Sequence, residues 1–188
     1  FNTFGGAFQI LAMMILFPVL RRFMNTLNIF YFSFSMAFAG YLVLLVIAFS
    51  GSSNVYLLLI PAFLIMSAIG MLNVIVTVFL ANTVDYGEWN NNRRDESVIF
   101  SMQTFVVKLA SGVAALAASI VIWIFHIQKD ETAEVLTAID AGSRMGLRMC
   151  MTILPILVLL IGLAVFRKNY ALTEERLEQI NEDLKERH

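Results

Sequence analysis

The chain has 188 residues, of which 59% are hydrophobic and 14% are charged, and its mean hydropathy is +0.77. Soluble domains carry about 25% charged residues, so this composition excludes an ordinary soluble domain and indicates an integral membrane protein. The formal net charge of −1 gives no basis for nucleic-acid binding, and the single cysteine, Cys150, excludes an internal disulfide framework.

Charged side chains are concentrated in a few segments. Residues 1–20 and 23–84 contain no Asp, Glu, Lys or Arg, whereas residues 167–188 hold eleven of the 27 charged residues (13 Lys and Arg, 14 Asp and Glu). We therefore predict two parts, a transmembrane bundle at residues 1–168 and a polar, amphipathic tail at residues 169–188. The chain begins with Phe1 and is expected to be a piece of a longer protein.

Five apolar runs are long enough to cross a bilayer as helices, because an α-helix rises about 1.5 Å per residue and the hydrocarbon core is about 30 Å thick. Pro61 is expected to kink the third run or to lie near its start, since proline removes a backbone donor. In the tail, a thin apolar stripe predicts one more helix, at residues 173–187, which either lies against the bundle or a partner or serves only as a solubilising tail. The predicted fold is an all-α integral membrane bundle of five transmembrane helices, at residues 4–20, 27–49, 55–80, 97–125 and 149–166.

Basic residues in the connecting segments orient this bundle, because cytoplasmic loops carry an excess of Lys and Arg. When the loops are assigned alternately to two sides, one side receives six basic residues and the other three: Arg21, Arg22, Arg93, Arg94, Arg167 and Lys168 against Lys129, Arg144 and Arg148. We predict that the loop at residues 82–96 and the tail helix are cytoplasmic. Residues 128–146 are then an outside loop.

A single lysine stands in the middle of the fourth run, which is otherwise free of ionisable groups. Helical spacing places Ser101, Thr104, Lys108, Ser111 and Ser119 on one face of this helix. An ammonium at membrane depth costs about 3 kcal/mol on insertion scales, so it is expected to face protein or water and to find an anion. The pattern indicates a lined pathway or binding site. The alternative is a structural lysine that snorkels or closes a buried ion pair.

The third run carries polar and small residues at helical spacing, Gly70, Asn73 and Thr77. Close helix packing would explain Gly70, because glycine lets two backbones approach. Asn73 has two interpretations, a hydrogen bond to a neighbouring helix or a contact with a substrate.

Acidic and basic residues alternate in the segment that joins the third and fourth runs: Asp85, Glu88, Arg93, Arg94, Asp95 and Glu96. They could form ion pairs at helix ends, where Asp95 and Glu96 would offset the unpaired N–H groups of the fourth helix. They could also form a gate that opens and closes as two bundles rock. Paired carboxylates could serve acid–base catalysis, but no nucleophile, histidine or metal-ligand cluster accompanies them. We expect neither an enzyme nor a metal site.

The run ANTVDYGEWNNNRRDESVIFSMQTFVVKLASG, at residues 81–112, resembles the signature of the glycoside–pentoside–hexuronide:cation symporters. This family contains the relatives of melibiose permease within the major facilitator superfamily. The resemblance implies that the five spans correspond to helices 8–12 of a twelve-helix transporter of the plasma (cell inner) membrane. The missing amino-terminal half of the same transporter would hold the first seven helices. The implied function is secondary active sugar:cation symport by alternating access.

The resemblance also implies roles for individual residues. Lys108 matches a membrane-embedded lysine near the cation and sugar sites, and Gln103, Thr104 and Val107 match positions around the sugar. This chain departs from melibiose permease at two positions: Asn73 stands where that protein has a tryptophan on the tenth helix, and Asn82 stands where it has an aspartate. The cytoplasmic gate implied by the family consists of Asp85, Tyr86, Glu88, Arg93, Arg94 and Glu96.

The implied partners are a sugar, a co-transported Na⁺ or H⁺, the amino-terminal half and the lipid bilayer, with no cofactor. Two other functions remain open at this point. One is symport of a lysolipid or another amphiphile, and the other is a non-transporting membrane sensor or scaffold.

Overall fold

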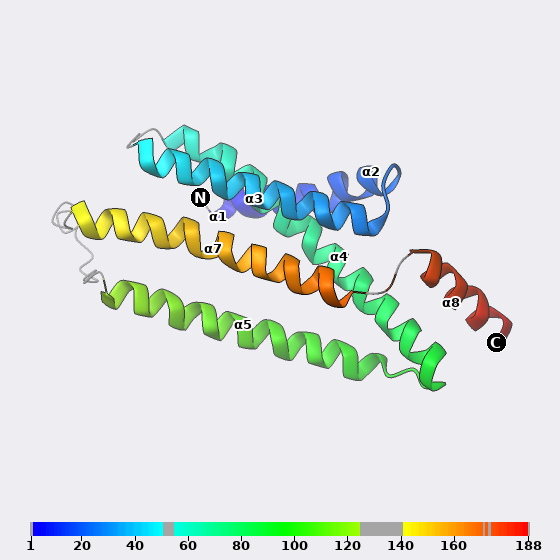
Figure 1. Cartoon of the computed structure of the whole chain (residues 1–188). Coiled ribbons are helices and arrows are strands. Elements are labelled where there is room, and N and C mark those ends of the chain that lie inside the picture. The colour runs from blue at the N-terminus through cyan, green and yellow to red at the C-terminus, as the bar shows by residue number, and fades with distance from the viewer. Residues whose placement is uncertain (1, 51–54, 125–140, 171, 173, 188) are drawn as a thin grey trace.

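The computed structural model describes residues 2–50, 55–124, 141–170, 172 and 174–187 (Figure 1). Within these ranges the chain is helical apart from short turns. Four helical segments are long and apolar enough to cross a membrane, Thr26–Ser50, Tyr56–Asn91, Glu96–Ile124 and Met145–Asn169. A shorter apolar helical segment, Gly6–Arg21, precedes them. The all-α membrane class predicted from composition is confirmed.

The first predicted span is an interrupted helix. It consists of α1 (Asn2–Leu11), a π-helical turn (Ala12–Leu16) and α2 (Phe17–Arg21). The π-turn ends directly before Phe17 and Pro18. Proline has no backbone N–H with which to continue the α-helical hydrogen bonds, so the wider turn lies where the regular pattern has to change.

The second and fourth spans are placed correctly by the apolar pattern. Helix α3 covers Thr26–Ser50 and α5 covers Glu96–Ile124, each within one residue of the predicted limits. Pro61 is buried near the start of the next helix, after a 3₁₀ turn at Val55–Leu58, so the second of its two predicted placements is correct.

Helix α4 (Leu59–Asn91) is longer than predicted, and the prediction of a loop over residues 82–96 is wrong for most of its length. Asp85, Tyr86 and Glu88 lie on its last turns instead. Its 33 residues span about 50 Å, well beyond a hydrocarbon core of about 30 Å. The polar extension remains helical because Val84 is buried, at 2% exposure, and because the tail helix packs beside it.

Helix α7 (Ala141–Asn169) begins earlier than the predicted fifth span. The predicted outside loop at residues 128–146 is therefore wrong for its last six residues, and the rest of that loop lies outside the described residues. The tail helix α8 (Glu174–Arg187) agrees with the predicted range within one residue.

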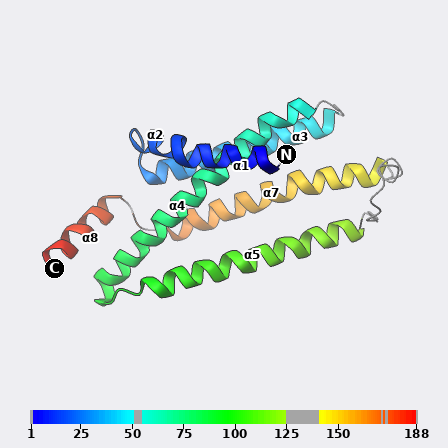
Figure 2. The ribbon, with the colours of Figure 1, turned by 180° about the vertical axis from the view of Figure 1, so that it is seen from behind.

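The packed core joins α1, α2, α3, α4 and α7 (Figures 1 and 2). Near one end of the bundle, rings from three helices are in contact. Phe30 of α3 lies 4.1 Å from Phe166 of α7 between ring centroids, and Phe79 of α4 stacks on Phe166 at 5.5 Å. Tyr170, just beyond α7, packs on Phe79 at 4.8 Å. This cluster fixes where α7 crosses α3 and α4.

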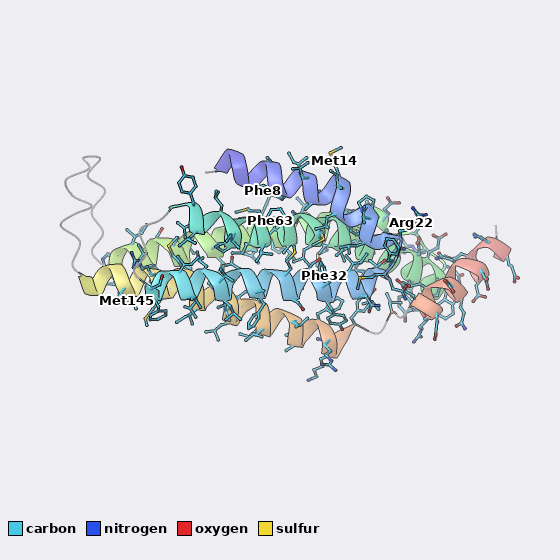
Figure 3. The ribbon with its side chains drawn as sticks, turned by 90° about the horizontal axis from the view of Figure 1, so that it is seen from above. Phe8, Met14, Arg22, Phe32, Phe63 and Met145 are labelled. Carbon is cyan, nitrogen blue, oxygen red and sulfur yellow. The ribbon has the colours of Figure 1, made fainter. Side chains whose placement is uncertain are left out.

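Two glycines bring helices close to α4. A Cβ atom on Gly40 of α3 would lie 2.7 Å from Ile65 Cγ1, and a Cβ on Gly70 of α4 would lie 2.6 Å from the backbone oxygen of Gln9. Close packing accounts for Gly70, as its sequence context indicated. Beside this contact, Phe8 and Phe63 meet edge to face at 5.2 Å, and both are labelled in Figure 3.

Replacing Gly70 by alanine is expected to destabilise the protein by about 1–3 kcal/mol, because the new methyl group meets backbone that cannot rotate away. Gly162→Ala is the matched control, since nothing lies within 4 Å of its added Cβ on α7. The melting temperature of the full-length protein in detergent measures both. Equal melting temperatures for the two variants would contradict the close approach of α1 and α4.

Helix α5 stands apart from this core. It joins α4 through the short turn at residues 92–95 and runs beside α7 in both views (Figures 1 and 2), yet none of its residues is buried. In the described residues, α5 therefore leaves most of its circumference uncovered.

Candidate functional site

The polar stripe of α5 is displayed on the surface of the bundle. Thr104, Lys108, Ser111 and Ser119 are exposed. Three of these side chains donate hydrogen bonds to carbonyl oxygens one turn back, Thr104 to Phe100 at 3.0 Å and Ser111 and Ser119 to Val107 and Ala115 at 2.9 Å. Because each of these hydroxyls already donates a hydrogen bond within its own helix, it can lie at membrane depth without the cost of burying an unpaired donor.

Lys108 lies near the midpoint of α5, about 18 Å from the start of the helix and about 24 Å from its end. Snorkelling cannot easily carry the ammonium to water over that distance. None of the described carboxylates lies within ion-pair distance of it. The structure therefore presents an exposed cation at mid-span whose counter-charge must come from elsewhere.

The face of α5 that turns toward α7 is different from the stripe. A groove of about 560 Å³ lies between the two helices, and its α5 wall consists of Ala114, Ala117, Ala118, Val121 and Ile122. None of these residues belongs to the stripe that carries Lys108. The groove lies along residues 114–122, in the half of α5 beyond Lys108, so α7 does not cover the lysine there.

The other residues implied around the sugar are not gathered into one pocket. Gln103 is half-buried, whereas Val107 is exposed on α5 and Asn73 is exposed on α4. Within the described part of the chain, the Asn73 side chain forms no hydrogen bond with α5. The first of the two interpretations of Asn73, a hydrogen bond to a neighbouring helix, is therefore not supported within the described residues.

The turn between α4 and α5 assembles a cluster of charges around Arg94. The Arg94 guanidinium lies 2.9 Å from a Glu88 oxygen, 3.3 Å from Glu96 and 3.6 Å from Asp85. We call these four residues the Arg94 cluster. Hydrogen bonds with Glu88 and Glu96 raise the pKa of Arg94 above its already high ordinary value, so the arginine keeps its charge throughout the physiological range.

A residue in the left-handed backbone conformation produces the turn that assembles the Arg94 cluster. Asn92 has φ 54° and ends α4 by donating its backbone N–H to the Glu88 carbonyl at 2.9 Å. Asparagine tolerates this conformation better than other residues with side chains. The chain then reverses within residues 92–95, which brings Arg94 back over the last turns of α4 and places Glu96 at the start of α5.

Two residues of the predicted gate lie outside the Arg94 cluster. Arg93 is 80% exposed in its side chain and comes only within 4.0 Å of Asp95. Tyr86 packs near Trp89, with ring centroids 6.1 Å apart. The predicted set is thus divided into four residues that meet and two that do not join them.

The sequence did not single out Trp89, whereas the docking of α8 on the bundle is one of the placements predicted for the tail helix. The Trp89 indole N–H donates to Asp183 of α8 at 2.8 Å, and Ile180 of α8 is buried at 2% exposure. At the other end of α8, Glu174 accepts the backbone N–H of Thr26 at 2.8 Å. The apolar stripe of the tail was the only available signal for this contact.

A family model described as MFS/sugar transport protein matches residues 1–174. The raffinose carrier protein of Pediococcus pentosaceus is 29% identical over 173 residues, which cover 90% of this chain and 25% of the carrier. The lactose permease of Lactobacillus delbrueckii subsp. bulgaricus is 28% identical over 183 residues, covering 97% of this chain and 27% of the permease. An inner membrane symporter of Escherichia coli, YicJ, is 29% identical over 129 residues, covering 66% of this chain and 27% of the symporter.

This chain spans about a quarter of the length of the curated relatives it matches. The match of the family model extends from the first helix through the start of α8, and it agrees with the signature at residues 81–112. The chain belongs to the major facilitator superfamily of sugar transport proteins, in the group that resembles the glycoside–pentoside–hexuronide:cation symporters.

Proposed function

We propose that the full-length protein is a secondary active transporter that couples sugar uptake to Na⁺ or H⁺. The observation that carries this proposal is the exposed Lys108 at mid-span, on a polar stripe, in a chain whose relatives are sugar carriers and symporters. An intramembrane charge is rare and costly, and it marks an ion or substrate pathway more often than a structural contact.

In this proposal the stripe of α5 faces an amino-terminal half across the transport path. Carboxylates of that half bind the coupling cation, and Lys108 balances their charge when the cation leaves. Gln103, Thr104, Val107 and Asn73 contribute contacts to the sugar. The free circumference of α5 supports this arrangement, because a helix with a mid-span lysine needs protein or water on that side.

The Arg94 cluster forms the ion-paired part of a cytoplasmic gate in this proposal, and Arg93 and Tyr86 lie beside it without joining its ion pairs. Ion pairs on one side of a rocking bundle favour the conformation in which they form. The docked α8 supports this assignment, because it holds the same turns of α4 through Trp89 and Asp183.

The same proposal places the protein in the cell inner membrane with its carboxyl terminus in the cytoplasm. Residues 1–168 form the transmembrane part and residues 169–188 the cytoplasmic tail. Three basic segments lie at one end of the bundle (Figure 1): the end of α2 with Arg21, the α4–α5 turn with Arg94, and the end of α7 with Arg167. This common location supports the assignment by the positive-inside rule.

Uptake into proteoliposomes that contain the full-length protein tests the function. Labelled raffinose and lactose are the first substrates to try, because two relatives carry those names. We expect an imposed Na⁺ or pH gradient to drive sugar accumulation, and dissipation of the gradient to abolish it. Gradient-driven movement of a lysolipid without any sugar transport would favour the amphiphile symporter. Transport of neither class under both gradients would contradict the proposal.

A further inference from the structure

Arg148 lies at the opposite end of the bundle from the Arg94 cluster. It occupies the first turn of the apolar span Met145–Asn169, beside the last turn of α3. Figure 3 shows this separation, with Met145 labelled at one end of the bundle and Arg22 at the other. Arginine at such a depth places its guanidinium at the boundary between hydrocarbon and headgroups.

One edge of the guanidinium is already bound. The Arg148 Nη1 donates to the backbone oxygen of Ala48 at 3.2 Å, one of the carbonyls that the end of α3 leaves unpaired. A guanidinium has five N–H donors, so this bond leaves most of them available. None of the described carboxylates lies within ion-pair distance of Arg148. The side chain is thus held in place, and no carboxylate of the described residues compensates its charge.

An apolar groove begins at this arginine. Its volume is about 290 Å³, and Arg148 meets it beside Leu44, Ile47, Ala48, Leu58 and Met151. Leu44 lies one turn deeper along α3 than Ala48, so the groove leads from the guanidinium toward the membrane interior. The other polar side chain of the lining, Thr152, donates its hydroxyl to the Arg148 carbonyl at 2.9 Å. The groove therefore offers hydrocarbon contact below a single cation.

We propose that this groove binds an anionic phospholipid, with its phosphate on the Arg148 guanidinium and one acyl chain between α3 and α7. Charge complementarity identifies the headgroup, because guanidinium pairs with phosphate through two parallel hydrogen bonds. The apolar lining and its place within two membrane spans identify the acyl chain. Basic pockets between transmembrane helices bind lipid headgroups in the same way.

The test measures binding of dioleoylphosphatidylglycerol to the full-length transporter in detergent, by native mass spectrometry over a lipid titration. Arg148→Gln removes the charge, and we expect it to weaken the tightest lipid binding by about fivefold or more. Arg148→Lys should retain part of the affinity, since it keeps the charge without the planar donors. Arg22→Gln removes an exposed arginine from the other end of the bundle and should leave the binding unchanged.

Ala48→Leu fills the groove while Arg148 stays in place, and it should weaken binding of the lipid by itself. This variant also keeps the test decisive if Arg148→Gln does not fold. An excess of inorganic phosphate should not displace the lipid, whereas displacement by phosphate would show a site for soluble anions and overturn the proposal. Wild-type affinity in either Arg148→Gln or Ala48→Leu would overturn it as well.

Discussion

Replacing Lys108 by valine in the full-length transporter is expected to reduce cation-driven sugar uptake by about two orders of magnitude or more. Removing one member of a buried charge pair typically costs several kcal/mol, and each 1.4 kcal/mol or so corresponds to a factor of ten. Carboxylates left without this counter-charge should hold a proton, because desolvation raises the pKa of an unpaired acid. The variant should then fail to exchange its coupling cation.

The amount of Lys108→Val protein in the membrane should stay normal, since removing a charge from mid-span eases insertion. Lys168→Val is the matched control, because Lys168 is an exposed lysine in the last turn of α7, at the edge of its span. Uptake and membrane level are measured for both variants. Normal coupled uptake by Lys108→Val would refute the coupling role. Loss of the protein from the membrane would instead show that Lys108 closes a structural ion pair.

Reversing the charge of Arg94 is expected to slow transport several-fold while the affinity for sugar is kept. Arg94→Glu would place a fourth carboxylate next to Asp85, Glu88 and Glu96, where the wild-type protein has the cation that joins them. The resulting repulsion should disfavour the conformation in which the cluster is closed, and a gate acts through that equilibrium rather than through contacts with substrate.

Arg93→Glu is the matched control for this experiment. It makes the same change of charge one residue earlier, at a side chain that reaches only Asp95, and at 4.0 Å. We expect it to have little effect, because exposed ion pairs are screened by solvent. Equilibrium sugar binding and the uptake rate separate the two roles. A collapse of sugar affinity with unchanged turnover, or equal effects of Arg93→Glu and Arg94→Glu, would contradict the gate.

Two physical signals in the sequence were strong enough to predict structure. Long apolar runs bounded by polar residues placed α3 and α5 within one residue, because span length is set by the thickness of the bilayer. Helical periodicity placed Thr104, Lys108 and Ser111 on one face, since that phase follows from local geometry alone. All five polar side chains of this stripe, Ser101, Thr104, Lys108, Ser111 and Ser119, are indeed exposed, and what faces them is not set by helical periodicity.

Which carboxylates Arg94 contacts could be identified only from the folded chain. The alternation of charges along residues 85–96 is compatible with a loop, a gate or a catalytic pair, and hydropathy ends the span near Leu80. The helix continues to Asn91 because contacts distant in sequence support it, including Trp89 with Asp183 and the packing of α8. The left-handed Asn92 then selects which carboxylates Arg94 meets, and it excludes Arg93 from the cluster.

The sequence by itself determined that this protein is a membrane-spanning helical bundle with one mid-span cation, because bilayer thickness and helical pitch constrain every such chain in the same way. Tertiary structure alone decided that α4 extends beyond the membrane, that α8 docks on it and that Arg148 caps α3 above an apolar groove. Each of these depends on partners about 90 to 150 residues apart or on a backbone turn at one residue, and local patterns of hydropathy and charge do not encode such pairings.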